Sequence, residues 1–360
     1  MTDATAQGAP AAPRSSRSLR RPPSRDAVCS ALATVGLGAV VPLVRLAGGE
    51  NPRGQLRELW RALGVPVLAI VVFVWAWAAV APQVQTSLGA IPGPAQVWAQ
   101  AGVLFEDHRA QRAEAAAFYE RQEARNARFA EAGQHERIKW RDYTGHPTYL
   151  DQIATSLKTV FFGFVLASLV AIPLGILCGL SPTINAAFNP LIQIFKPVSP
   201  LAWLPLVTMV VSAVYVSDDP LFEKSFLNSA ITVTLCSLWP TLINTAHGVA
   251  AIDRDLVNVG KVLRLGWWTQ ITKIVLPSAL PLIFTGLRLS LGVGWMVLIA
   301  AEMLAQNPGL GKFVWDEFQN GSSASLARIM VAVFTIGIIG FLLDRLMLTL
   351  QALVTHRPAH

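Results

Sequence analysis

The chain has 360 residues, of which 53% are hydrophobic and only 14% are charged. Soluble domains usually carry about 25% charged residues, so this composition excludes an ordinary soluble protein and favours one that is solvated by lipid. The formal net charge of +7 does not indicate nucleic acid binding, because nine of the 29 basic residues fall in the first 61 positions, beside the first long apolar run. Such a bias is typical of the cytoplasmic side of a membrane.

The first part of the chain, residues 1–63, is basic and begins with about 25 residues rich in Pro, Ala and Arg. An apolar segment follows only after this stretch, so no secretory signal is predicted there and we expect a disordered cytoplasmic tail. The three cysteines, Cys29, Cys178 and Cys236, lie far apart, without a CxxC pair or a nearby His cluster. Neither a metal site nor a disulfide is predicted.

Six segments are long and apolar enough to cross a bilayer core of about 30 Å as helices that rise about 1.5 Å per residue. They are residues 64–82, 159–180, 197–216, 225–246, 279–301 and 329–354. The first four contain no charged residue, the fifth contains only Arg288, and the sixth contains Asp344 and Arg345. The sequence therefore predicts an all-α integral membrane protein with six transmembrane helices.

A seventh segment, residues 27–44, is shorter and rich in Ala and Gly. A crossing there would leave a group of arginines, beginning with Arg45 and Arg53, on the outside, so we expect an interfacial helix instead. With the amino terminus in the cytoplasm, six crossings return residues 355–360 to the cytoplasm. The connection 248–276, with its four basic residues, then also lies in the cytoplasm.

The outside loop, residues 83–155, holds a stretch at 104–140 that is rich in Ala, Glu and Arg and is expected to be helical. Its mixed charge is typical of a solvated face. The alternative is a docking surface for a partner.

A transporter with its own fuel would carry a phosphate-binding GxxxxGK loop followed by Ser or Thr. Here Gly260-Lys261 is followed by Val262, and Gly311-Lys312 is followed by Phe313. No paired carboxylates and no Ser/His/Asp arrangement stand out. The sequence predicts no enzyme and no cofactor in this chain, so any ATPase must be a separate chain.

The cytoplasmic connection contains a short amphipathic helix. Asp253 or Asp255 is placed to cap it, and Leu256, Val259 and Leu263 recur at helical spacing to form an apolar stripe. A stripe of this kind favours contact with a partner; the alternative is a simple amphipathic connector.

The same connection continues with residues suited to the membrane surface. We expect Gly266 to end the short helix and Trp267 and Trp268 to lie at the interface. Pro277 then marks the approach to the fifth span.

The connection resembles the coupling loop of binding-protein-dependent ABC importer permeases. That loop has Glu-Ala-Ala, three residues, Gly, and a Leu-Pro about twelve residues later. Alignment on Leu276-Pro277 puts residues 258–260 (Asn258, Val259 and Gly260) at Glu-Ala-Ala and Arg264 at the glycine. This departure removes the acidic residue of the motif but keeps the helix-turn-helix shape.

The resemblance covers roughly residues 147–350 and is closest to the nitrate branch of the nitrate/sulfonate/bicarbonate permeases. The matching stretches are residues 196–205, 239–245, 277–288, 300–303, 309–316 and 340–345. It implies a type I ABC importer permease fold in the bacterial inner membrane, with residues 156–354 as the permease core. The residues it assigns to ATPase coupling are Asp255, Leu256, Asn258, Val259, Gly260, Leu263, Arg264 and Gly266.

The resemblance also implies partners: a second permease, identical or similar, cytoplasmic ABC ATPases that hold ATP and Mg²⁺, and an extracytoplasmic substrate-binding protein. Nitrate is the first choice of substrate, and nitrite, cyanate, an alkanesulfonate such as taurine or bicarbonate are the alternatives. A secondary transporter or channel would normally show internal repeats or a charged relay in its spans. A membrane-anchored scaffold would leave the coupling loop without a purpose.

Two features are candidates for the substrate pathway. Arg288 is a charge deep in a span, which suits an anion pathway; the alternatives are pairing with backbone carbonyls or with a carboxylate on another helix, or snorkelling. In the fourth span, Asn228 and Thr232 belong to one polar row and Asn244 to a second. Such rows line pores or pack helices through small hydroxyls. Glu302 and Lys196 are expected to be interface residues rather than ligands.

Overall fold

The computed structural model describes residues 41–47, 52–86, 89–216, 221–322 and 324–355. The predicted disordered tail, most of segment 27–44 and residues 356–360 lie outside this range. The chain divides into two units, Met1–Val67 and Leu68–His360. The first unit contains α2 (Val41–Ala47), α3 (Pro52–Leu59), the π-helical turn η2 (Trp60–Gly64) and the first residues of α4 (Val65–Val80).

Five helices of the described residues are long and apolar enough to cross a membrane. They are Arg53–Gln83, α6 (Tyr149–Leu180), α9 (Lys224–Ala250), Trp267–Ala305 and α14 (Ser325–Thr355). Five of the six predicted spans fall within these helices. The helix Trp267–Ala305 joins α11 (Trp267–Gln270), the π-helical turn η5 (Ile271–Val275) and α12 (Leu276–Ala305).

The remaining predicted span, 197–216, covers only the second half of a broken pair of helices. α7 (Pro182–Phe195) and α8 (Pro200–Val214) meet at 101°, and together they pass the same test of length and hydropathy. The break falls where Pro200 starts a new helix and the Ser199 hydroxyl accepts the Leu201 amide at 3.3 Å. α7 is not among the six predicted spans, because its row of amide side chains interrupts the apolar run.

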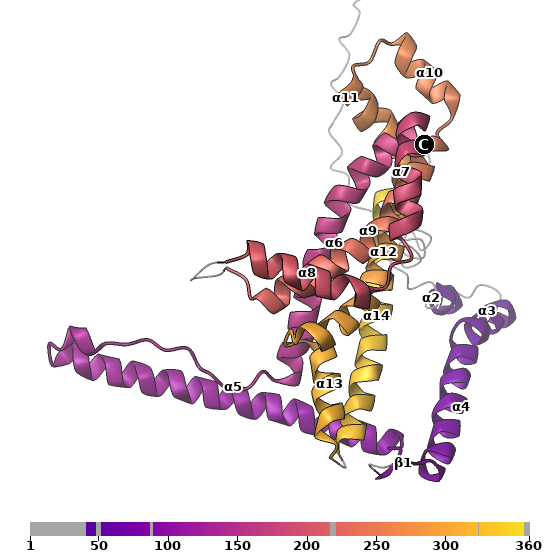
Figure 1. Cartoon of the computed structure of the whole chain (residues 1–360). Helices are drawn as coiled ribbons and strands as arrows, with labels where there is room; N and C mark the ends of the chain where they lie inside the picture. The colour runs from indigo at the N-terminus through magenta and orange to yellow at the C-terminus, as the bar shows by residue number, and fades with distance from the viewer. Residues whose placement is uncertain (1–40, 48–51, 87–88, 217–220, 323, 356–360) are drawn as a thin grey trace, which may run out of the picture. The chain divides into compact units, whose positions relative to one another are not determined.

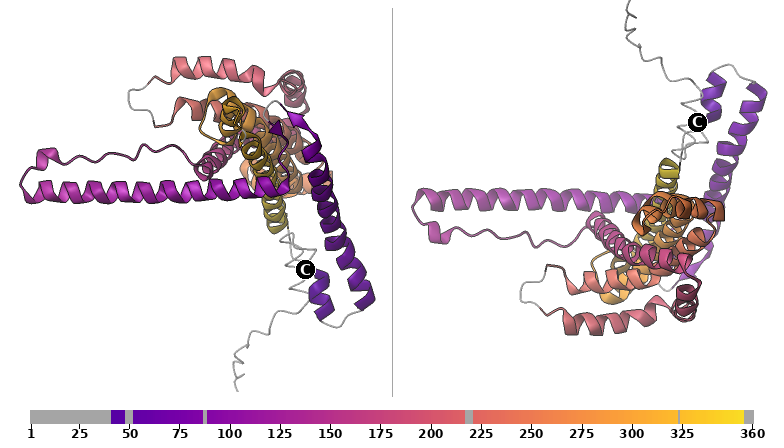
Figure 2. Two further views of the ribbon diagram at one scale, coloured as in Figure 1. Left: turned by 90° about the horizontal axis from the view of Figure 1, so that it is seen from below. Right: turned by 90° about the horizontal axis from the view of Figure 1, so that it is seen from above.

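The loop predicted to lie outside, residues 83–155, forms a long helical arm. After η3 (Ala81–Gln83) and a two-stranded antiparallel ribbon, β1 (Gln85–Thr86) and β2 (Gly89–Ala90), α5 (Pro94–Glu131) extends away from the bundle (Figures 1 and 2). The helix starts ten residues before the predicted stretch 104–140 and ends nine before its end. It stops early because Gly133 adopts a left-handed φ of 68°, which lets the Gln134 amide bond to Phe129 O at 2.9 Å.

The chain returns along α5 and is tied to it by buried amides. Gln122 exchanges two hydrogen bonds with the backbone of Arg141, at 3.1 and 2.8 Å, and Asn126 donates to Lys139 O at 3.0 Å. The short 3₁₀ turn η4 (His135–Arg137) lies in this return segment. The arm is therefore an ordered element.

The centre of the bundle is α9, which packs against α6 on one side and α12 on the other. α6 presents a small residue at every fourth position to α9: Gly163, Ala167, Ala171, Gly175 and Gly179. A Cβ added at Gly163, Gly175 or Gly179 would lie 2.7–2.8 Å from a carbonyl oxygen of α9. Backbones can approach this closely only because these side chains are missing.

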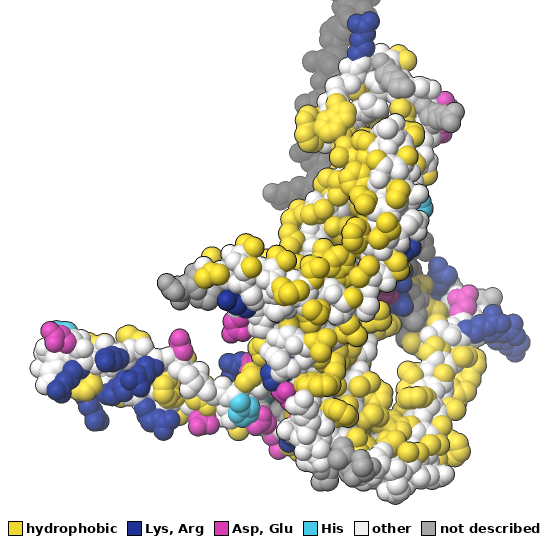
Figure 3. Space-filling view, viewed as in Figure 1, with side chains coloured by type: hydrophobic (Ala, Val, Ile, Leu, Met, Phe, Trp, Pro, Cys, Tyr) yellow, Lys and Arg dark blue, Asp and Glu magenta, His cyan; other side chains and the backbone are white. Residues whose placement is uncertain are grey.

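The outer faces of the bundle are apolar. Five of its large apolar side chains are 52–70% exposed in the single chain: Phe161, Leu169, Met209, Leu289 and Met296. Figure 3 shows hydrophobic side chains over most of the visible face of the bundle, whereas charges gather on the α5 arm. This distribution fits a bundle that is solvated by lipid.

We predict that Gly175→Ala destabilises the protein by about 1–3 kcal/mol, because the new methyl group would lie 2.8 Å from Leu242 O and 2.6 Å from Thr245 Cβ. Gly337→Ala is the matched control, since a Cβ there meets nothing within 4 Å and mid-helix Ala is favoured over Gly by about 0.5–1 kcal/mol. The measurement is thermal unfolding of the detergent-solubilised protein. Equal melting temperatures for the two variants would contradict the packing.

Candidate functional site

The predicted coupling helix is α10 (Arg254–Val262), and it lies at one end of the bundle between α9 and α11 (Figure 1). Of the two aspartates considered for its cap, Asp253 performs the role. Its Oδ1 accepts the Asp255 amide at 2.9 Å, and its carbonyl accepts the Val257 amide at 3.3 Å.

The side chains of the apolar stripe of α10 are about half exposed or more in the single chain. Leu256, Val259 and Leu263 are 48%, 52% and 64% exposed. Gly260, one turn after Leu256 and at the edge of the stripe, is buried, and a Cβ there would lie 3.0 Å from Ile274 Cδ1. Asn258 and Asp255 are exposed. The helix therefore rests on η5 through Gly260 and offers its leucines and valine to the outside.

The prediction that Gly266 ends this helix is wrong. Arg264 ends it, with a left-handed φ of 51°, and the Leu265 amide bonds to Gly260 O at 3.0 Å. This is the geometry in which glycine is favoured at helix ends. Arg264 thus stands at the sequence position of the glycine in the family's motif and has a backbone conformation that favours glycine. Gly266 instead has an extended conformation and precedes α11.

The coupling helix is connected to long helices on both sides. α9 ends at Ala250, three residues before Asp253, and α11 begins the helix that continues to Ala305. Trp267 and Trp268 are 54% and 71% exposed at that junction and contact each other edge to face. α10 is therefore joined by short segments to two helices of the bundle, α9 and the helix Trp267–Ala305.

Arg288, which has no neighbour of opposite charge in the sequence, has one in space. Its guanidinium forms a two-pronged ion pair with Asp344 of α14, with Nη2 3.1 Å from Oδ2 and Nε bonded to Oδ1. The side chains are 40% and 34% exposed in the single chain. Of the alternatives considered for Arg288, a carboxylate on another helix is the one that the structure contains, and the pair ties α12 to α14.

The predicted pathway residues of α9 are mostly buried between helices. Asn228 is 6% exposed and Thr232 is fully buried, with its hydroxyl bonded to Asn228 O at 2.7 Å. Asn244 is half-buried and donates to Pro240 O at 2.8 Å. These bonds fall on the backbone of α9 itself. The structure does not bring the three residues together with Arg288 around a common cavity.

A second set of α9 hydroxyls serves the contact with α12. The Ser290 hydroxyl accepts the Thr241 amide at 3.0 Å and the Thr241 hydroxyl at 2.7 Å, and it donates to Ser237 O. It thereby inserts a side chain into the backbone of α9 beside Pro240, where kinks are expected. These hydroxyls act as packing residues.

Glu302 is more than the interface residue that the sequence predicts. It is fully buried, and its carboxylate accepts the Ser156 hydroxyl, whose one proton is shared between Oε1 at 2.9 Å and Oε2 at 2.8 Å, and the Gly311 amide at 3.0 Å. Ser156 also accepts the Leu310 amide at 2.8 Å, so the carboxylate secures the start of α13 (Leu310–Asn320) to α6 and α12. The two glycines of the Gly-Leu-Gly run, Gly309 and Gly311, leave room for it. The Gly-Leu-Gly run was the sequence feature that could have indicated a close contact at this position.

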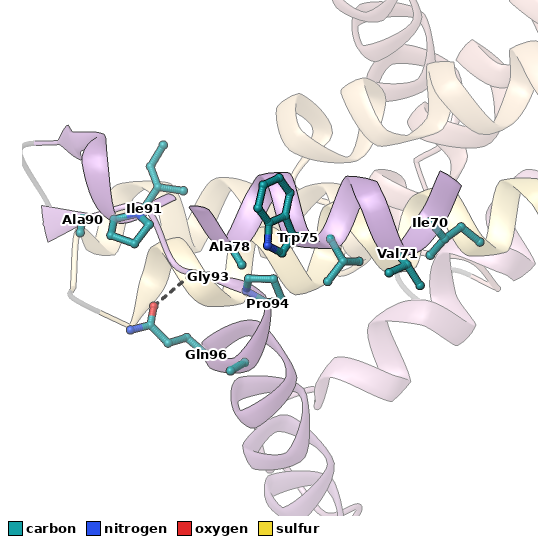
Figure 4. A pocket seen from close by; sticks show the side chains of 12 residues that line it. Ile70, Val71, Trp75, Ala78, Ala90, Ile91, Gly93, Pro94 and Gln96 are labelled. Carbon is teal, nitrogen blue, oxygen red and sulfur yellow. Dashed lines mark hydrogen bonds between the residues drawn. The ribbon is translucent and has the colours of Figure 1, made fainter. Parts of the chain in front are cut away.

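A cavity of about 700 Å³ beside α4 is a poor candidate for an anion site. Its lining is mainly apolar side chains of α4 and of the turn that leads into α5, among them Ile70, Trp75 and Pro94. Figure 4 shows these side chains together with the hydrogen bond of 3.1 Å from the Gly93 amide to Gln96. No charged side chain lines it.

Comparison with known proteins agrees with this architecture. Residues 171–358 match the family described as binding-protein-dependent transport system inner membrane component. A bicarbonate transport system permease protein of Synechocystis is 33% identical over 315 residues, which is 86% of this chain and 95% of that protein. A nitrate import permease protein of Synechococcus elongatus is 35% identical over 204 residues, which is 57% of this chain and 69% of that protein.

Among solved structures, the MetNI methionine ABC transporter in an inward-facing conformation has a chain that matches with a TM-score of 0.50 and 13% identity. The match covers 58% of this chain and 96% of the other. It shows a common fold, that of type I ABC importer permeases.

We predict that Arg264→Gly stabilises the end of α10, because glycine adopts the left-handed conformation without the cost that a Cβ imposes. Hydrogen exchange of the α10 amides should slow about fivefold, which corresponds to about 1 kcal/mol. Arg264→Ala is the control, since it removes the charge but keeps the Cβ. Equal exchange rates in the two variants would show that the backbone strain is not what limits α10.

Proposed function

Because the chain belongs to the family of binding-protein-dependent transport system inner membrane components, we propose that it is the subunit through which an ABC importer moves nitrate into the cytoplasm. The observation that carries this proposal is the chemistry shared by its relatives. Nitrate and bicarbonate, which appear in the names of those relatives, are both planar oxyanions with a single negative charge. A pathway that accepts one therefore has the size and charge to accept the other.

Bicarbonate is the second candidate. It is favoured by the extent of the match to the Synechocystis bicarbonate permease, which runs over nearly the whole length of both chains. Cyanate and alkanesulfonates such as taurine rank below nitrate and bicarbonate as candidate substrates.

ATP hydrolysis and the initial binding of substrate would be carried out by other chains. Two permease subunits, identical or similar, would form the pathway in the bacterial inner membrane, with both termini in the cytoplasm. An ABC ATPase with ATP and Mg²⁺ would dock on each α10, whose exposed Leu256, Val259 and Leu263 support such a contact. An extracytoplasmic binding protein would deliver the anion. ATP-driven closure of the ATPases would then switch the pathway between inward-open and outward-open.

The test of the substrate is uptake into cells that lack their own nitrate and bicarbonate importers and express this chain with its cognate ATPase and binding protein. We expect uptake of labelled nitrate that stops when the ATPase is inactivated, and no uptake of labelled taurine. Uptake of bicarbonate alone would favour the second candidate, and uptake of taurine alone would overturn both.

We predict that Leu256→Asp uncouples ATP hydrolysis from transport, because it places a charge in an apolar contact. Uptake should fall about tenfold or more, the factor that 1.4 kcal/mol produces, while ATP hydrolysis continues. Val262→Asp is the control: it adds the same charge to the same helix at an 81% exposed position, about a quarter turn from the stripe. Normal uptake in Leu256→Asp would remove the proposed role of α10.

Arg288 is proposed to act on the anion pathway as well as in its ion pair with Asp344. Arg288→Gln should therefore lower nitrate uptake about tenfold, the effect of about 1.4 kcal/mol, with the complex still assembled. The double variant Arg288→Gln with Asp344→Asn removes the unpaired carboxylate that the single variant leaves behind. If Arg288 served only the ion pair with Asp344, uptake would recover in the double variant. Unchanged uptake kinetics in Arg288→Gln would reject both the ion-pair role and the pathway role.

A further inference from the structure

A polar cavity of about 360 Å³ lies between α6, α7 and α9, at the end of α9 that leads into α10. Five polar side chains line it together with apolar residues of α6 and α9. Four come from α7 and the residue that follows it, namely Asn185, Asn189, Gln193 and Lys196, and the fifth is His247 of α9. The lining contains no carboxylate.

The four side chains from α7 form a single row. They recur at intervals of four, four and three residues, which at about 100° per residue keeps them within about 80° of one another. Lys196 still has helical backbone angles, so the row continues to the bend before α8. The far side of the helix is apolar, with Leu191 and Ile194 47% and 62% exposed.

Such a row is unusual in an apolar helix of a membrane protein. Amide and ammonium groups are costly against lipid, and in transporters they usually face a water-filled cavity or a neighbouring polar group. Here the row faces the cavity and α9, while Ile194 on the other side is available to lipid. Hydrogen-bond donors therefore line the cavity along α7, from Asn185 to Lys196.

Lys196 has no counter-charge among the residues that the structure describes. The ion pairs of these residues engage Arg112, His146, Arg288, Lys312 and Arg328. The one hydrogen bond within the row joins Gln193 Nε2 to Asn189 Oδ1 at 3.5 Å. An ammonium group and several amide donors are thus free to bind an anion.

We propose that this cavity binds a small monovalent oxyanion, held by the Lys196 ammonium group and by amide donors of Asn185, Asn189 and Gln193. The inference rests on the proposed function: if α10 is cytoplasmic, the cavity is the place from which the imported anion is released. It adds a site that none of the predicted pathway residues touches. One cation with neutral donors suits a singly charged anion and favours weak binding, as release requires.

The test is anion protection of a cysteine placed in the row. The assembled transporter carrying Asn189→Cys, with the tail cysteine removed by Cys29→Ser, is placed in nanodiscs of phosphatidylcholine, so that no anionic headgroup competes. Its reaction with a cationic thiol reagent is timed in nitrate, in bicarbonate and in gluconate of equal ionic strength. The parent with Cys178 and Cys236 alone gives the background rate.

Nitrate and bicarbonate should slow the reaction about fourfold when their concentration is about three times the Kd, because only the free site reacts. Ile194→Cys, on the far side of α7, is the matched control and should react at the same rate in every anion. Adding Lys196→Gln should abolish the protection, whereas Lys196→Arg should retain it.

Three results would overturn the inference: no protection at Asn189→Cys by either anion, equal slowing at Ile194→Cys, or undiminished protection in Lys196→Gln. The uptake assay separates this outcome from failure of the proposed function. Nitrate uptake without protection removes the site and leaves the function. Protection without uptake of nitrate or bicarbonate leaves the anion site and removes the proposed substrate.

Discussion

The close contact of α9 with its two neighbours is the constraint on which the rest of the bundle depends. Lipid offers no hydrophobic drive for helices to associate, so their packing must come from backbone approach and from buried hydrogen bonds. α6 supplies the approach through its row of Gly and Ala, and α12 supplies the bonds through Ser290. Gly286 allows a similar close approach between α12 and α9, because a Cβ there would lie 3.0 Å from Pro240 O.

The proposed role of α10 in coupling depends on this packing. A surface helix transmits force only if its ends are fixed to elements that move as rigid bodies. α10 is joined by short turns to α9 and to the helix Trp267–Ala305, and Glu302 near the far end of that helix is locked to α6 and α13. Under the proposed function, a push on α10 would be transmitted along α12 to the opposite end of the bundle. An apolar stripe on a flexible loop would have no such effect.

Much of this fold could be predicted from the sequence, because lipid imposes long apolar runs that are easy to recognise. The ends of the helices were harder to predict than their existence. Gly133 ends α5 as a glycine should, but α10 ends at Arg264, and no rule of residue preference would choose Arg for a φ of 51° when Gly266 lies two residues away. The pairing of Arg288 with Asp344 was also beyond local patterns, since the partners lie 56 residues apart. α7 was missed because its amide row lowers the apolar character that was used to find spans.

The same amide row changes where an anion pathway should be sought. α9 is rich in hydroxyls and amides, but most of them are buried, and several bond to the backbone of α9 itself. α7 has fewer polar side chains, yet they face a cavity together with a lysine that lacks a counter-charge among the described residues. In a membrane helix, a polar group already bonded within the protein stabilises the fold, whereas one that faces a cavity is available to a solute. What decides between these roles is the direction in which the side chains point and whether their bonding capacity is already used.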